Sequence, residues 1–200
     1  MLGYVVKILS VCTGNVCRSP FAEQFLQAEL GLVSPRQFRV SSAGTHALVG
    51  HGIDQGSALL LKESGFEAIA FAARQVSSEL LEESDLILTM TREQRAWLLR
   101  QSPRILKRVF TVREFARALN YVVKHAGASV PRGADPATVS YRWAEICRQA
   151  SFYRSDGGDL DDVVDPYRSS KEVYMQMYDE LVPALDIIVS FEEWASNTAV

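Results

Sequence analysis

The residues with the clearest chemical potential stand together near the start of the chain. They follow a short apolar segment and read Cys12-Thr13-Gly14-Asn15-Val16-Cys17-Arg18-Ser19. Gly14 permits close backbone approach and a positive φ, and Asn15 is the non-glycine type that best tolerates the left-handed conformation. Arg18 can direct two parallel N–H groups at two phosphate oxygens, which a lysine cannot do. These residue types predict a loop that binds phosphate.

Cys12 is the candidate nucleophile of this loop. Backbone N–H groups, the positive end of a following helix and the Arg18 guanidinium all favour a thiolate over a thiol. The Ser19 hydroxyl can add a hydrogen bond to the sulfur. A thiolate at the centre of a phosphate site can attack phosphorus in line and form a phosphocysteine intermediate. The loop is not of the Walker type, because no Gly-Lys-Ser/Thr follows Gly14.

Alternating periodicities on either side of the loop predict the elements that position it. Short apolar runs rich in β-branched residues alternate with segments whose apolar residues recur at helical spacing. The predicted strands are 5–11, 38–41, 86–90 and 108–112, and the predicted helices are 21–31, 54–63, 92–100 and 113–125. This order predicts an α/β fold in which a parallel sheet is covered by helices on both faces. Ligands bind such sheets at the carboxyl ends of the strands, where the Cys12 loop would lie.

The boundaries of the early helices are predicted from single residues. Ser19 is the expected N-cap of the first helix, with Pro20 in its first turn. Gly31 is the expected end of that helix, and Gly65 closes the second.

The second half of the chain has a weaker pattern. We expect a loop at 127–136, a short helix at 141–152 and a mobile acidic loop at 155–162. The spacing of Ser169-Ser170-Lys171-Glu172 predicts a capping box that opens the last helix. Pro183 is expected to kink or split that helix.

The composition of the chain limits the classes of protein to which it can belong. The chain has 200 residues, 48% of them hydrophobic and 22% charged, with a net charge of -3. We therefore expect one domain over 1–200 and no binding of nucleic acid. No apolar stretch approaches the roughly 20 residues that cross a bilayer, and residues 1–7 lack the features of a signal peptide, so we expect a cytoplasmic protein without membrane insertion. Three cysteines and three histidines predict neither a disulfide framework nor a zinc site, and we expect no metal or cofactor.

The string from Val11 to Pro20 closely resembles the signature of the bacterial-type low-molecular-weight protein tyrosine phosphatases. The resemblance implies a three-layer, flavodoxin-like fold with a four-stranded parallel sheet and helices on both faces. It also implies hydrolysis of phosphate monoesters, with phosphotyrosine in proteins as the preferred substrate. It implies catalytic roles for Cys12 and Arg18. The residues that it implies at the phosphate or substrate are Thr13, Gly14, Asn15, Val16, Cys17, Ser19 and Tyr167.

A late motif, Asp165-Pro166-Tyr167, matches the Asp-Pro-Tyr motif of the same family. The resemblance implies that Asp165 protonates the leaving group and then acts as general base on water. It also implies that Tyr167 forms a wall for the aromatic ring of the substrate. Ser41–His46 resembles the family's second-strand motif, whose second serine, here Ser42, supports Asn15 through hydrogen bonds.

Several positions depart from the family pattern. Ala73-Arg74-Gln75 resembles a further stretch of the family. The family often has a histidine shortly before this Ala-Arg-Gln stretch, and residues 70–72 of this chain contain none. Ala47 and Leu48 replace an aromatic wall, and Arg168 stands where many relatives have a second tyrosine. The stretch 113–160 is longer than in a minimal member, and its role is open. These departures concern substrate preference and leave the nucleophile in place.

Alternatives for individual cysteines and histidines are open. Cys17 could be a packing residue or could form a reversible disulfide with Cys12. Cys147 lies in a helical context and is expected to be structural. No role is assigned to the histidines, which are His46, His51 and His125.

Three other functions are compatible with the same loop. Arsenate reduction would need further thiols, and no cysteine lies between Cys17 and Cys147. An arginine phosphatase tends to carry threonine where this chain has Val16, so tyrosine is preferred. A non-catalytic phospho-binding module would be expected to lose Cys12 or Asp165, and both are present. The expected partner is a phosphorylated protein, with a tyrosine kinase among the candidates.

Overall fold

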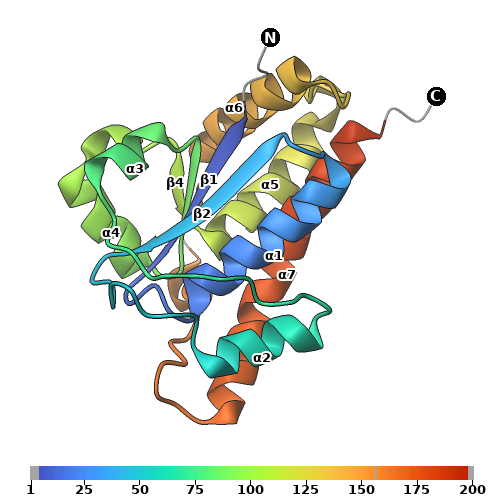
Figure 1. Cartoon of the computed structure of the whole chain (residues 1–200). Helices are drawn as coiled ribbons and strands as arrows, with labels where there is room; N and C mark the ends of the chain where they lie inside the picture. The colour runs from blue at the N-terminus through green and yellow to red at the C-terminus, as the bar shows by residue number, and fades with distance from the viewer. Residues whose placement is uncertain (1–4, 156, 198–200) are drawn as a thin grey trace.

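The centre of the protein is a parallel β-sheet. A computed structural model describes residues 5–155 and 157–197. Four strands pair in the order β2-β1-β3-β4, and all three pairings are parallel. The strands are β1 (Val6–Cys12), β2 (Phe38–Gly44), β3 (Leu86–Thr89) and β4 (Val109–Thr111). The predicted α/β architecture is confirmed, and Figure 1 shows the sheet running through the middle of the molecule.

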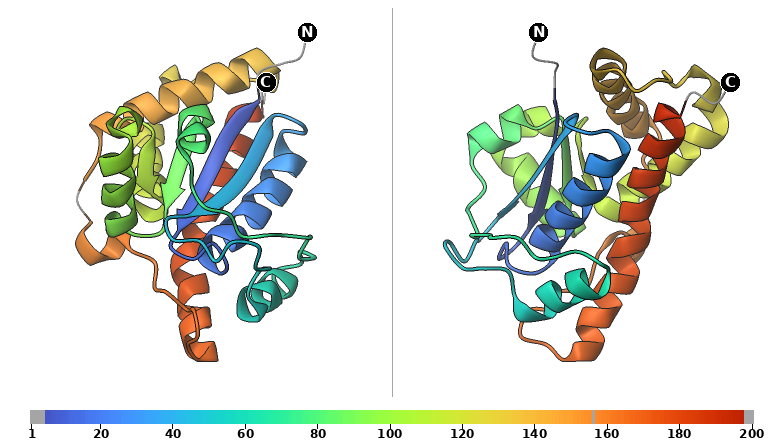
Figure 2. Two further views of the ribbon diagram at one scale, coloured as in Figure 1. Left: turned by 60° about the vertical axis from the view of Figure 1, so that its left-hand side comes forward. Right: turned by 45° about the vertical axis from the view of Figure 1, so that its right-hand side comes forward.

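Helices cover both faces of this sheet. They are α1 (Arg18–Val33), α2 (Gln55–Glu63), α3 (Ser78–Glu83), α4 (Arg92–Gln101), α5 (Val112–Ala126), α6 (Pro136–Phe152) and α7 (Lys171–Ser196). Three short 3-10 turns are η1 (Pro103–Ile105), η2 (Gly127–Ser129) and η3 (Gly158–Asp161). Helices α1, α5 and α7 lie on one face, whereas α3 and α4 lie on the other (Figures 1 and 2).

Burial of the central strand β1 on both faces explains why most of its residues are apolar. Val6 and Ile8 pack into the larger core beneath α1, α5 and α7, whereas Leu9 and Val11 pack into the smaller core beneath α3 and α4. Successive side chains of a strand point to opposite faces, so a strand that is buried on both faces needs apolar residues at both odd and even positions. This burial holds the carboxyl end of β1, at Cys12, in the interior.

The expected ends of the first helix were wrong. Helix α1 begins at Arg18, with Cys17 as its N-cap and no capping hydrogen bond from a side chain, so Ser19 lies inside the first turn. The Ser19 hydroxyl is turned toward Cys12 instead. Gly31 lies within the helix, which continues to Val33 because nothing at Gly31 requires a positive φ.

Three elements of the second half also differ from expectation. Helix α6 begins at Pro136, capped by the Asp135 carboxylate, and is therefore longer than the predicted 141–152. The predicted mobile loop at 155–162 instead contains the turn η3, in which the Asp161 side chain is buried. Helix α3, capped by the Ser77 hydroxyl, was not predicted.

The last helix is continuous. Helix α7 includes Pro183 within a single assigned span, so the proline does not split it. Its N-cap is Ser170, which makes no capping hydrogen bond, and the predicted capping box is absent. No helix in the described part of the chain combines the length and hydropathy needed to span a membrane.

A buried ion pair joins the long segment 113–160 to the last helix. Helix α6 crosses the end of the sheet opposite the Cys12 loop (Figure 2). Arg142 donates from Nη2 to Oε1 of Glu192 at 2.7 Å, and Trp143 donates from Nε1 to Oε2 at 2.8 Å. All three side chains are fully buried. Buried charges of this kind depend on one another, because an unpaired charge in the interior is costly.

Replacement of Glu192 by alanine should therefore destabilise the protein strongly. It would leave the Arg142 guanidinium buried without its carboxylate, and we expect the free energy of unfolding to fall by about 3–5 kcal/mol. Urea denaturation followed by circular dichroism measures this loss. Glu193→Ala, at the exposed neighbouring position, is the matched control and should change stability by less than about 0.5 kcal/mol. Equal losses in the two variants would contradict the role of the buried pair.

Candidate active site

The Cys12 sulfur lies at the floor of the predicted loop. Cys12 is the last residue of β1 and is almost completely buried. Its Sγ accepts a hydrogen bond from the backbone N–H of Asn15 at 3.3 Å and lies 3.0 Å from the Ser19 hydroxyl. Helix α1 starts six residues after the strand ends, so its N-terminus faces the loop. N–H groups, a hydroxyl and a helix N-terminus together favour negative charge on the sulfur.

The side chain of Asn15 holds the loop in shape. Asn15 has a φ of 56°, the left-handed conformation expected for it. Its amide donates to Ser19 Oγ at 2.9 Å and to Ser42 Oγ at 2.8 Å, so the expected support from Ser42 is present. Its amide oxygen accepts from the backbone N–H of Arg74 at 2.9 Å. One side chain thus ties the loop to α1, to β2 and to the 70–75 segment.

Two residues of this support were not identified from the sequence. Ser42 donates its own proton to Glu23 at 2.5 Å, and Arg74 donates from Nε to the Ser42 carbonyl at 2.8 Å. Burial raises the pKa of the Glu23 carboxyl, while the Ser42 hydrogen bond opposes that shift. Arg74 belongs to the Ala-Arg-Gln stretch, and its backbone takes part in supporting the loop where residues 70–72 offer no histidine.

Gly14 shows neither the positive φ nor the close backbone approach expected for it. It does not adopt a positive φ, because Asn15 provides the left-handed turn. A Cβ at Gly14 would lie 3.6 Å from Val16 and 3.8 Å from Leu48, within the lining of the pocket. The closest backbone approach occurs instead at Gly44, where a Cβ would collide with the carbonyl oxygen of Thr13.

Arg18 and Asp165 meet above the loop although they lie far apart in the sequence. Nη2 of Arg18 is 2.6 Å from Oδ2 of Asp165, and Nη1 donates to the Val163 carbonyl at 3.1 Å. The Arg18 side chain is 3% exposed and that of Asp165 is 52% exposed. Arg18 Nε is buried and makes no hydrogen bond with any described residue. The guanidinium therefore retains an unused donor at the loop.

These residues enclose a pocket of about 170 Å³. It is lined by Cys12, Thr13, Gly14, Val16, Cys17, Arg18, His46, Leu48, Asp165 and Tyr167. The pocket thus brings together all but three of the site residues predicted from the sequence. The exceptions, Asn15, Ser19 and Ser42, are fully buried and do not line the pocket. No role was assigned to His46 from the sequence, and Leu48 was noted only as replacing an aromatic wall. The fold brings both residues, in the loop after β2, against the pocket.

The loop that carries Asp165 is anchored by polar contacts on its N-terminal side. Asp161 is 2% exposed, and its Oδ1 lies 2.6 Å from Nη1 of Arg117 on α5. The next residue, Asp162, accepts from the backbone N–H of Arg92 at 2.7 Å. Val163 then donates from its backbone N–H to the Met90 carbonyl at 2.8 Å. Three consecutive residues are therefore held by α4, α5 and the end of β3.

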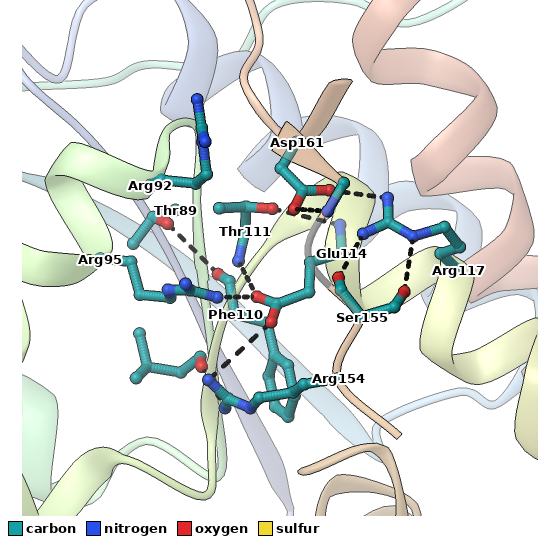
Figure 3. A network of polar contacts seen from close by, with 12 residues as sticks. Thr89, Arg92, Arg95, Phe110, Thr111, Glu114, Arg117, Arg154, Ser155 and Asp161 are labelled. Atoms are coloured by element: carbon teal, nitrogen blue, oxygen red, sulfur yellow. Dashed lines mark hydrogen bonds and ion pairs between the residues drawn. The ribbon is translucent and has the colours of Figure 1, made fainter. Parts of the chain in front are cut away.

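A second carboxylate extends this network into the segment 113–160. Figure 3 shows the Arg95 and Arg154 side chains converging on Glu114, and Arg117 reaching both Asp161 and Ser155. Arg154 stacks 4.2 Å from the centre of the Phe110 ring, and burial lowers the pKa of its guanidinium. The extra length of the chain thus contributes contacts beside the Asp165 loop.

Removal of Arg117 should loosen this loop. In Arg117→Ala, the buried Asp161 carboxylate loses its cation, so we expect amide hydrogen exchange at Val163 and Val164 to accelerate about tenfold, equivalent to roughly 1.4 kcal/mol. Native-state exchange read by NMR measures the effect. Lys124→Ala, at an exposed position on the same helix, is the control. Unchanged protection of both amides in Arg117→Ala would show that the ion pair does not hold the loop.

The model of one protein family matches most of this chain. The model is described as low molecular weight phosphotyrosine protein phosphatase, and it matches residues 7–127. The chain belongs to this family. The match covers the Cys12 loop and its support but stops before Asp165, so the late motif depends on the geometry described above.

Bacterial proteins named as low molecular weight protein-tyrosine-phosphatases are similar in sequence. Wzb of Salmonella typhi is 42% identical over 103 residues, which are 52% of this chain and 66% of that protein. Etp of Escherichia coli K12 is 38% identical over 99 residues, which are 50% of this chain and 64% of that protein. The alignments thus span no more than about two thirds of these curated relatives.

Solved structures extend the similarity to almost the whole chain. A low molecular weight protein tyrosine phosphatase from T. tengcongensis matches with a TM-score of 0.65 and 26% identity, covering 92% of this chain and 98% of that one. The arginine phosphatase YwlE from Geobacillus stearothermophilus matches with a TM-score of 0.65 and 25% identity, covering 92% and 91%. The three-layer, flavodoxin-like fold implied by the sequence is therefore that of the family.

The second cysteine of this low molecular weight phosphatase loop is a buried thiol. Burial, with the nearby Asp54 carboxylate, raises the pKa of Cys17 to about 12. Its Sγ lies 3.8 Å from the Tyr174 hydroxyl, which donates a short hydrogen bond to Asp54. Cys12, Cys17 and Cys147 are all free. The packing role considered for Cys17 is thus present in this structure, and a disulfide is not.

Alkylation should distinguish the two loop cysteines. A raised pKa keeps Cys17 protonated at pH 7, and its thiolate becomes abundant only near pH 12, so iodoacetamide should label Cys12 in preference to Cys17. Peptide mass spectrometry after brief labelling at pH 7 measures this, and Cys12→Ser should remain almost unlabelled. Labelling of Cys17 as fast as Cys12 would contradict the assignment. Burial also raises the pKa of Cys147, which should stay unmodified.

Proposed function

We propose that this protein hydrolyses phosphate monoesters of tyrosine in proteins, through a phosphocysteine intermediate on Cys12. The observation that carries the proposal is the arrangement around one sulfur atom. The Cys12 thiol lies at the floor of a pocket that Arg18 and Asp165 also line, and it receives an N–H from Asn15. Nucleophile, phosphate-binding guanidinium and carboxylic acid thus share one cavity.

In this proposal, the loop and Arg18 bind the phosphate group of the substrate. The phosphate oxygens accept hydrogen bonds from backbone N–H groups of the loop and from the first turn of α1, whose dipole favours an anion. The Arg18 guanidinium, which now contacts Asp165 and Val163, reorients its fork toward two of these oxygens. This exchange frees the Asp165 carboxyl for proton transfer.

The first chemical step transfers phosphorus to sulfur. The Cys12 thiolate attacks phosphorus, and the bond between phosphorus and the phenolic oxygen breaks. Asp165, in its protonated form, gives its proton to that oxygen, so that a neutral phenol leaves. The half-exposed position of Asp165 at the rim supports this role, because the leaving group lies on the outer side of the phosphate.

The second step returns the enzyme to its starting state. The Asp165 carboxylate takes a proton from water, and the water oxygen attacks phosphorus. The bond between phosphorus and sulfur breaks, so inorganic phosphate forms and the Cys12 thiolate is restored. The Ser19 hydroxyl, 3.0 Å from the sulfur, stabilises the thiolate as leaving group. Every proton and electron pair in this scheme is handled by side chains of the chain and by water, so the proposal includes no metal or cofactor.

The lining of the pocket supports an aromatic leaving group. Val16 and Leu48 contribute apolar surface, and the half-exposed Tyr167 ring stands at the rim. An apolar lining suits a phenyl ring better than a guanidinium, which is more strongly hydrated. We propose a phosphorylated protein as substrate, with a tyrosine kinase among the candidates. A reducing compartment such as the cytoplasm would keep the three thiols free.

Hydrolysis of p-nitrophenyl phosphate tests the proposal. Cys12→Ser should lose at least about a thousandfold in kcat, and Asp165→Asn about a hundredfold or more, because each removes a group that acts in the transition state. Cys147→Ala, which changes a buried thiol outside the pocket, is the control and should retain activity. Wild-type rates in Cys12→Ser would overturn the phosphatase assignment.

Substrate comparison separates the rival functions. A phosphotyrosine peptide should be turned over with a higher kcat/KM than a phosphoarginine peptide of the same sequence. The reverse order would favour an arginine phosphatase, the activity named for one similar structure. Thiol-dependent reduction of arsenate without phosphate release would indicate a reductase. Tight binding of the phosphopeptide with no turnover of any substrate would indicate a binding module.

A further inference from the structure

A second hollow opens directly beside the phosphate pocket. It has a volume of about 380 Å³ and shares four of its lining residues, Thr13, Arg18, His46 and Asp165, with that pocket. Its outer wall is formed by the start of α4 and its flanks, with Thr45, Thr91, Glu93, Gln94, Trp97 and Val163. A peptide whose phosphorylated residue enters the first pocket must therefore place a neighbouring residue at or near the second.

The wall between the two hollows is preorganised. Gln94 donates from Nε2 to the Thr13 hydroxyl at 3.1 Å, which fastens α4 to the Cys12 loop. Its Oε1 accepts from the backbone N–H groups of Met90 and Thr91, each at 3.0 Å. Because one buried side chain makes all three bonds, the second hollow has a fixed position relative to Cys12.

An aromatic ring and a carboxylate line the outer wall. Glu93 and Trp97 lie four residues apart on α4, so their side chains occupy the same face of the helix. The His46 ring packs edge-on against Trp97, with ring centres 5.7 Å apart. An indole face beside a carboxylate is a favourable setting for a cation, which both groups attract.

The arginines around the hollow are paired with carboxylates other than Glu93. Within the described part of the chain Glu93 forms no ion pair, and Arg92 and Arg95, its neighbours on α4, are paired with carboxylates of other segments. Arg18, the one arginine in the lining, is paired with Asp165. A bound phosphate would add further negative charge nearby. An acidic residue is favourable at this position because it lies at the N-terminus of α4. Trp97, which lines the same hollow, adds a second group that attracts a cation.

We propose that this hollow is a specificity subsite for a cationic side chain, arginine or lysine, adjacent to the phosphotyrosine of the substrate. The proposal rests on the proposed phosphatase function. The ammonium or guanidinium group lies between the Glu93 carboxylate and the Trp97 ring, and its aliphatic stem lies along His46. Arginine is favoured over lysine because its planar group can stack on the indole while donating to the carboxylate.

Phosphotyrosine peptides that differ in one flanking residue test the subsite. One set carries arginine, alanine or glutamate directly after the phosphotyrosine, and a second set carries them directly before it. In the wild type, kcat/KM should be highest for arginine in at least one set. Glu93→Gln should lower the ratio of the arginine to the alanine peptide about fivefold, the effect of losing an ion pair of roughly 1 kcal/mol. Glu93→Lys should invert the preference toward glutamate.

The control variant is Glu82→Gln, which removes an exposed carboxylate outside the lining of both hollows. It should leave the ratio at the wild-type value. If the peptides are hydrolysed but wild type and Glu93→Lys rank them identically, the subsite is overturned while the phosphatase function stands. If neither the peptides nor p-nitrophenyl phosphate are hydrolysed, the proposed function fails, and the subsite fails with it.

Discussion

The geometry of the phosphate loop depends on one buried amide side chain. Asn15 occupies a left-handed conformation, which ordinary residues adopt only at a cost, and its hydrogen bonds to Ser19, Ser42 and the Arg74 backbone compensate for that cost. Because Asn15 also presents its backbone N–H to Cys12, the same constraint that shapes the loop directs a donor at the sulfur. The shape of the loop and the N–H contact to the Cys12 sulfur therefore depend on the same residue.

The opposite side of the site depends on charge. Arg18 projects from the first turn of α1, and Asp165 reaches it from a loop near the end of the chain. That loop is held through Asp161 and Asp162, whose partners come from α5 and α4. Within the long segment 113–160, Arg117 contacts the loop that carries Asp165 through its ion pair with Asp161. In the same segment, Arg142 of α6 forms a buried ion pair with Glu192 of α7. We infer that this segment stiffens the carboxylate loop rather than forming a separate functional unit.

The fold was predictable where local and tertiary preferences agree. Buried strands and amphipathic helices have distinct periods, so the order of the main elements followed from the pattern. The errors arose where a tertiary contact replaced a local signal. Ser19 resembles an N-cap, yet its hydroxyl is used at Cys12. The segment 155–162 resembles a mobile acidic loop, yet Asp161 is buried because Arg117 of α5 neutralises it.

The sequence alone identified the candidate residues, because Cys12, Asn15 and Arg18 occupy one short loop with a recognisable spacing. Asp165 followed only through its resemblance to a family motif. The tertiary structure decided what surrounds them. His46 and Leu48 line the pocket because the crossover to β2 brings the loop after that strand beside Cys12. Glu23 of α1 meets Ser42 of β2 only when the helix packs on the sheet. Local pattern specifies residue types at fixed spacing, whereas burial and distance between remote segments arise only when the chain packs.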